Sequence, residues 1–202
     1  MMPYLRRCAL LAALLLSVAP TGPVAACAYE AVPGNLFQII HPGSLEVAVA
    51  MRKAFDDGLM AEPSATPAEL GQAGYWAAVR RLDRLQALLT ASPAAATLPP
   101  TSLVFIESAL WSRVMPAAAG VELQVHTEGA AAGDLVLVTG ESVLTAVLDG
   151  RLNAATAFDR GLIWLDGDPA AAAVLRALLL EALSDPHIAA NATQPALNPF
   201  AQ

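Results

Sequence analysis

The chain has 202 residues, of which 56% are hydrophobic and 14% are charged, and its formal net charge is −7. This length suits one domain with a sizeable core and a smaller additional region. The acidic balance opposes binding to nucleic acid or to an anionic membrane surface, so we expect neither as a partner.

The first 26 residues have the pattern of a secretion signal. Arg6 and Arg7 form a basic start, residues 8–19 form an apolar run too short to span a bilayer, and Val24-Ala25-Ala26 provides a small-residue cleavage site. Removal of residues 1–26 would leave nine basic residues against 18 acidic ones. We therefore expect an exported protein.

Cys27 is the only cysteine after this segment, so no disulfide can form within the exported chain. With the three residues before it, Cys27 resembles the lipobox of bacterial lipoproteins, which implies an acylated cysteine and a protein anchored to the outer membrane. Pro20 and Pro23 separate the apolar run from this box, as in an ordinary cleavage site that releases a protein into the periplasm. Both alternatives stay open, and contact with a membrane is expected only through such an anchor.

Residues 27–96 predict a mainly helical region. A helix is expected over 44–58, where Ser44 is a suitable N-cap and Gly58 a suitable left-handed end. A second helix starts at the capping box in residues 66–69 and ends in the proline-rich segment 91–100. Its apolar residues recur at helical spacing, which predicts a buried face.

Residues 97–183 predict an α+β domain with a small, largely antiparallel sheet flanked by helices. Residues 102–115, 120–128, 134–140 and 162–165 are expected as strands, and 141–149 and 154–160 as short helices that end at glycines. Asn153 and Asp168 are predicted N-caps, and Asp168 starts a last helix that is apolar nearly all round. Such a helix must be covered by protein or by ligand. Residues 184–202 are expected to be a flexible tail.

Residues 134–180 resemble the C-terminal half of the sterol carrier protein domain. The resemblance is carried, in order, by Thr139, Gly140, Leu144, Gly150, Leu152, Asn153, Ala157, Phe158, Gly161, Gly167 and Asp168. It implies a twisted sheet flanked by helices with an apolar tunnel that takes sterols, fatty acids, acyl-CoA or phospholipids. The residues expected to line or underlie this cavity are Val147, Leu148, Phe158, Leu162 and Trp164. The predicted export is a departure, because the lipid carriers of that family are mostly intracellular.

Reactive side chains form no recognisable constellation. His41, His126 and His187 show no metal-ligand spacing, and no serine stands in a nucleophile motif. We therefore expect no metal, no cofactor and no catalysis, but binding or carrying of an apolar small molecule or lipid in the bacterial cell envelope. One alternative is an interaction subunit of a periplasmic assembly that docks through the last helix. Another is a metal- or redox-linked accessory protein that uses Cys27 and His41.

Overall fold

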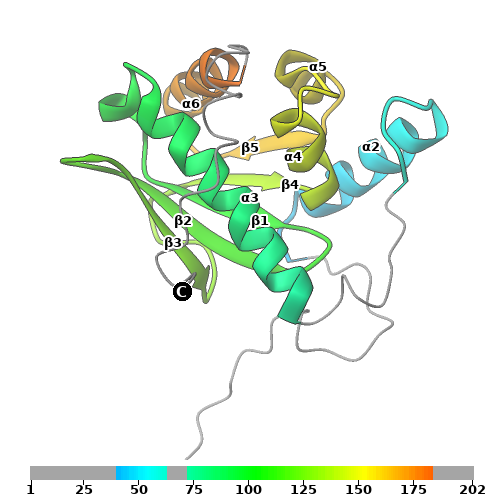
Figure 1. Ribbon diagram of the computed structural model, residues 1–202, viewed down its shortest axis with the longest axis horizontal. Helices are drawn as coiled ribbons and strands as arrows, with labels where there is room; N and C mark the ends of the chain where they lie inside the picture. Colours follow the sequence, from blue (N-terminus) through cyan, green and yellow to red (C-terminus); the bar gives the residue numbers. More distant parts are fainter. Residues whose placement is uncertain (1–39, 63–71, 184–202) are drawn as a thin grey trace, which may run out of the picture.

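The structure is a computed structural model that describes residues 40–62 and 72–183 (Figure 1). Cys27, the predicted signal and tail, and the capping box at 66–69 lie outside the described residues. The helices are α2 (Ser44–Asp56), α3 (Gln72–Ala91), the short 3-10 helix η2 (Ala95–Thr97), α4 (Glu141–Leu148), α5 (Ala154–Asp159) and α6 (Pro169–Ala182). The strands are β1 (Thr101–Phe105), β2 (Leu110–Ala117), β3 (Gly120–Thr127), β4 (Leu135–Thr139) and β5 (Ile163–Asp166).

The strands form one five-stranded sheet in the order β3-β2-β1-β4-β5. The central strands β1 and β4 are parallel, and the other neighbouring pairs are antiparallel. All residues of β1 and β4 are buried, so both faces of the sheet centre are covered. The predicted fold class, α+β with a largely antiparallel sheet flanked by helices, is therefore confirmed.

The prediction of a single strand over 102–115 was wrong, because this segment forms β1, a turn and most of β2. The turn occupies residues 106–109, and Phe105 pairs with Leu110 across it. Ala109 has a φ of 54°, a left-handed conformation that glycine or asparagine usually adopts. The turn carries neither residue, so the sequence gives no signal for it.

The predicted ends of the short helices are largely correct. The side chains of Asn153 and Asp168 accept hydrogen bonds from the backbone N–H groups of Ala155 and Ala170, and thus cap α5 and α6. Ser44 does not cap α2. The helix begins one residue earlier than expected, with Gly43 as N-cap, and the Ser44 hydroxyl instead accepts a hydrogen bond from the His41 backbone N–H.

The helices and the sheet share one hydrophobic core. Helix α3 crosses the sheet and packs against β3, α4 and α6 (Figure 1), with Leu82, Leu85 and Leu89 buried. Helix α2 contacts β4 and buries Val47 and Met51 in the same core. The two helices that precede the sheet in the chain therefore contribute directly to its packing.

Helix α6 is covered by the rest of the chain on its leucine-rich face. Leu175, Leu178 and Leu179 are buried, whereas Val174 is 41% exposed. Within the described ranges, no helix combines the length and the apolar character needed to cross a membrane.

Candidate functional site

An open apolar groove runs between α2 and the segment that connects α5 to β5. It has a volume of about 460 Å³ and is lined by Leu45, Glu46, Val49, Ala50, Lys53, Arg160, Gly161 and Trp164. Three large apolar side chains are unusually exposed here: Leu45 by 51%, Val49 by 62% and Trp164 by 41%. We call this site the apolar groove.

Close packing at the start of α2 fixes one wall of the apolar groove. A β-carbon added at Gly43 would lie 2.6 Å from Cδ1 of Trp164, so only glycine lets the indole approach the backbone this closely. Beside it, His41 Nε2 lies 3.3 Å from Asp166 Oδ2 at the end of β5. These contacts hold the residues before α2 against β5 and orient the exposed face of Trp164.

Charged groups stand at one rim of the apolar groove. Lys53 Nζ and Arg160 Nη1 both approach Asp57 Oδ2, at 3.0 and 3.4 Å. Two cations thus share one carboxylate on exposed side chains, while the aliphatic parts of Lys53 and Arg160 extend the apolar wall. Glu46 adds a carboxylate to the lining.

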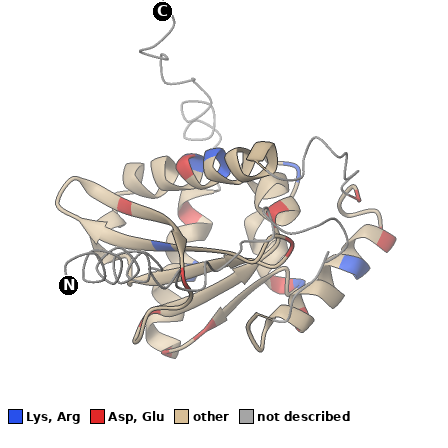
Figure 2. Cartoon of the chain, turned by 90° about the horizontal axis from the view of Figure 1, so that it is seen from below, with Lys and Arg blue, Asp and Glu red and all other residues tan. Residues whose placement is uncertain are grey.

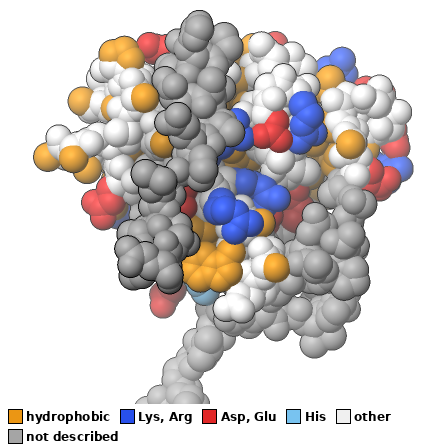
Figure 3. Space-filling view, in the orientation of Figure 1, with side chains coloured by type: hydrophobic (Ala, Val, Ile, Leu, Met, Phe, Trp, Pro, Cys, Tyr) orange, Lys and Arg blue, Asp and Glu red, His pale blue; other side chains and the backbone are white. Residues whose placement is uncertain are grey.

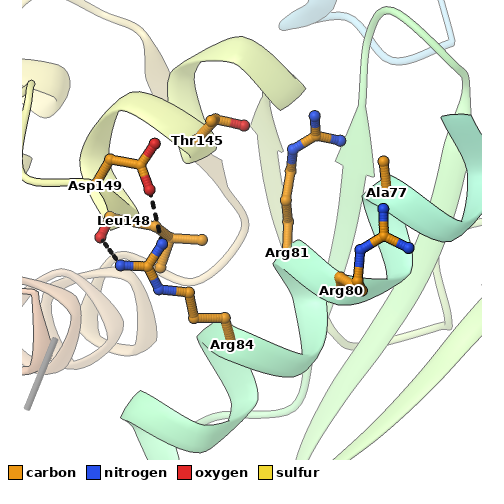
Figure 4. Close-up of a pocket in the computed structure, with 7 residues that line it drawn as sticks. All are labelled: Ala77, Arg80, Arg81, Arg84, Thr145, Leu148 and Asp149. Atoms are coloured by element: carbon orange, nitrogen blue, oxygen red, sulfur yellow. Dashed lines mark hydrogen bonds and ion pairs between the residues drawn. The ribbon is translucent and has the colours of Figure 1, made fainter. Parts of the chain in front are cut away.

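A second, smaller pocket lies between α3 and α4 (Figure 4). Its volume is about 270 Å³, and its lining is Ala77, Arg80, Arg81, Arg84, Thr145, Leu148 and Asp149. Arg84 Nη1 donates to Asp149 Oδ1 at 2.7 Å, and Arg84 Nη2 donates to the Leu148 carbonyl. Arg81 Nη1 lies 3.1 Å from Glu141 Oε2. We call this site the arginine pocket.

Asp149 is held as a carboxylate at the edge of the arginine pocket. Partial desolvation favours its protonated form, but the hydrogen bonds from Arg84 and Arg151 outweigh it and lower the pKa of Asp149 below its ordinary value. Arg151 Nη2 reaches the other oxygen, Oδ2, at 3.1 Å. The two arginines therefore bind the two oxygens of one carboxylate.

The residues predicted to line a lipid cavity occupy three different environments. Val147, Phe158 and Leu162 belong to the hydrophobic core, and Arg176 lies over the Phe158 ring with its Cζ atom 4.6 Å from the centroid. Leu148 lines the arginine pocket, and Trp164 lines the apolar groove. Their joint role around a ligand stays a prediction.

Both sites include residues that sequence reasoning did not single out as functional. Leu45 and Val49 are four residues apart on α2, outside its buried face, and this spacing is the only local signal for a second apolar strip. Arg80 and Arg84 show the same spacing on α3. Neither pair indicates its partner element, which lies far along the chain.

The groups proposed for metal or redox chemistry do not gather in the described part of the chain. No group of three or more His, Cys, Asp or Glu side chains suited to hold a metal ion occurs there. Among the acidic groups of the described residues, His41 contacts only Asp166, and Cys27 lies outside the described residues.

No protein-family model and no curated protein sequence matches the chain. Among solved structures, sterol carrier protein 2 matches over 55% of this chain and 93% of its own, with 20% identity and a TM-score of 0.41. A conserved hypothetical protein of Thermus thermophilus matches over 66% of this chain and 97% of its own, with 22% identity and a TM-score of 0.37. The alkylsulfatase Pisa1 of Pseudomonas sp. matches over 58% of this chain but only 18% of its own, with 16% identity and a TM-score of 0.39.

Further sterol carrier protein 2 structures occur among the matches. All these identities lie below 25% and all these TM-scores below 0.5. The function of this chain is therefore argued from its own residues.

Proposed function

We propose that this protein binds an apolar small molecule or lipid chain in the apolar groove and holds or carries it without changing it chemically. The observation that carries the proposal is the convergence of Leu45, Val49 and Trp164, three exposed apolar side chains from two distant segments, on one concave surface. Exposed apolar side chains that gather in a groove typically mark a binding site.

The size and lining of the apolar groove support a small ligand. Ligand sites commonly have volumes of about 300–1,000 Å³ and mostly apolar walls with a few polar groups. The groove has about 460 Å³, and its lining combines four apolar side chains with three charged ones, those of Glu46, Lys53 and Arg160.

The bacterial cell envelope is the proposed location. Its support is the secretion-signal pattern of residues 1–26 and the lipobox-like position of Cys27. A mass measurement of the N-terminus of the protein purified from membrane and periplasmic fractions would distinguish an acylated Cys27 from an ordinary cleavage product. A chain that retains residues 1–26 in the cytoplasm would contradict the proposed location.

The alternative of an interaction subunit that docks through the last helix has less support. Leu175, Leu178 and Leu179 of α6 are buried within this chain and are not available to a partner. Of the five large apolar side chains that are exposed among the described residues, Leu45, Val49 and Trp164 line the apolar groove, Trp76 lies on α3, and Val174 alone lies on α6.

The test compares two substitutions of exposed valines. Val49→Asp places a carboxylate in the apolar groove, and Val174→Asp places one on α6 outside it. Because both valines are exposed, we expect both variants to fold. Burial of a valine side chain contributes roughly 1.5–3 kcal/mol, so Val49→Asp should weaken binding of the fluorescent fatty acid cis-parinaric acid by about tenfold or more.

Val174→Asp serves as the matched control and should bind as the wild type does. Bromine-labelled palmitate should also quench the fluorescence of Trp164 in a protein whose other two tryptophans are replaced by phenylalanine. Equal binding by both valine variants, or no quenching of Trp164, would exclude the apolar groove as the binding site.

A further inference from the structure

The arginine pocket concentrates positive charge in an acidic protein. Nine basic residues follow residue 26, and four of them lie at this site: Arg80, Arg81 and Arg84 line it, and Arg151 binds its edge residue Asp149. Figure 2 shows acidic residues spread over strands, turns and helices, with a group of basic residues on α3. In Figure 3, Lys and Arg side chains gather near the centre of the face, over α3.

The carboxylates near the arginine pocket do not balance its cations. Glu141 pairs with Arg81, and Asp149 is shared by Arg84 and Arg151. The nearby Glu107 carboxylate accepts hydrogen bonds from the backbone N–H groups of Glu141 and Ser142, and it does not line the pocket. Three arginines and one aspartate line the pocket, and the flanking residues Arg151 and Glu141 add one charge of each sign, which leaves an excess of two positive charges.

The arginine pocket also holds donors without acceptors. Arg80 is exposed and has no hydrogen-bond or ion-pair partner within residues 40–62 and 72–183. Arg84 Nε is buried and has no acceptor among the residues described. A buried donor without an acceptor costs roughly 1–3 kcal/mol, so a small movement of the Arg84 side chain that brought Nε to an acceptor on a ligand would be favourable.

We propose that the arginine pocket binds a phosphate group. Guanidinium groups match the oxygens of phosphate with parallel, charge-assisted hydrogen bonds, and a dianion satisfies the excess of two positive charges. The volume of about 270 Å³ has room for a phosphate group. This site is separate from the apolar groove, and its function does not depend on the function proposed there.

The phosphate group can come from free phosphate or from a lipid headgroup, and two probes distinguish these sources. Inorganic phosphate and soluble dihexanoyl phosphatidic acid are each titrated into the full chain by calorimetry at constant ionic strength. Binding of both assigns the site to the phosphate group itself, and binding of the phosphatidic acid alone assigns it to a lipid headgroup. Saturation by neither probe at millimolar concentration overturns the proposal.

Arg80→Gln is the informative variant, because Arg80 has no described partner whose loss would disturb the fold. Arg52→Gln is the matched control: it removes the same charge from an exposed arginine on α2 that does not line the pocket. Arg80→Gln should weaken binding about tenfold or more, and Arg52→Gln less than twofold. Equal weakening by both variants would show a nonspecific charge effect and overturn the proposal.

Discussion

The carboxylate of Asp134 connects three strands at one end of the sheet. Arg113 of β2 donates to both of its oxygens, with N–O distances of 2.7 Å, and the Ser102 hydroxyl of β1 donates to Oδ2 at 2.8 Å. The Asp134 side chain is only 2% exposed, so these bonds replace its contacts with water. The hydrogen bonds from Arg113 hold the pKa of Asp134 below its ordinary value.

Replacement of Asp134 by asparagine should lower the free energy of unfolding by about 2–3 kcal/mol at neutral pH, because one charge-assisted pair is lost. Because the pKa of Asp134 is lower in the folded than in the unfolded protein, its carboxylate stabilises the fold at pH values above the unfolded-state pKa of about 3.9. This stabilisation is lost as the pH falls through the folded-state pKa. The stability gap between wild type and Asp134→Asn should therefore narrow in acid.

Chemical denaturation of both proteins at several pH values measures this gap. Other titrating groups, including Glu107, are present in both proteins. Their contributions to the pH dependence of the free energy of unfolding therefore cancel when the two proteins are compared. A gap that stays constant from neutral pH down to the acid range would contradict the role of the ionised Asp134 carboxylate.

At the scale of elements, α5 is a short helix whose C-terminal end leads into the apolar groove. It has six residues, and Arg160 and Gly161 of the groove follow it directly. At its other end, Asn153 Oδ1 accepts a hydrogen bond from Ala155 N at 2.8 Å. Since so short a helix has few internal hydrogen bonds, this cap matters for the position of the groove wall.

Asn153→Ala should therefore destabilise the protein by about 1 kcal/mol and also weaken fatty-acid binding in the apolar groove. Asp168→Ala removes the equivalent cap of α6, where Asp168 Oδ1 accepts from Ala170 N at 3.0 Å, and should cost similar stability. Thermal unfolding and cis-parinaric acid titration measure the two effects. Equal binding losses in both variants would show that the cap of α5 acts only through global stability.

The sequence predicts those features of the elements that depend on neighbouring residues. The caps at Asn153 and Asp168 are confirmed, as is the left-handed conformation of Gly58 after α2, with a φ of 69°. The turn at 106–109 could not be predicted, because its left-handed residue is an alanine.

The two candidate sites could not be predicted from local patterns, because each joins distant parts of the chain. Val49 meets Trp164 across the apolar groove, and Arg84 meets Asp149 across the arginine pocket. Helical periodicity shows that Arg80 and Arg84 share a face of α3, but it does not show which element that face approaches. Tertiary packing alone brings these residues together.

For the whole molecule, the shared core predicts that the helices before the sheet unfold together with it. The three tryptophans report on separate parts: Trp76 on α3, Trp111 on β2 and Trp164 on β5. Because α3 buries its leucines against the sheet, we expect the same unfolding midpoint from three variants that each keep a single tryptophan.

Fluorescence-monitored urea unfolding measures these midpoints, and circular dichroism supplies the control for helix content. A lower midpoint for Trp76 than for Trp164 would contradict a single cooperative unit. It would instead support residues 27–96 and 97–183 as separately folding domains.

The irregular edge strand β3 has a consequence for self-association. His126 has a φ of 63° and lies where the register between β2 and β3 shifts, so it bends the strand near its end. At the other end, the Gln86 side chain of α3 donates a hydrogen bond to the Val121 carbonyl, and the Thr90 hydroxyl of α3 accepts one from the Val121 N–H. A second molecule that approached this margin would meet a kink, the carboxylate of Glu122 and backbone groups already engaged. The sheet therefore offers no straight template on that side for growth into fibrils.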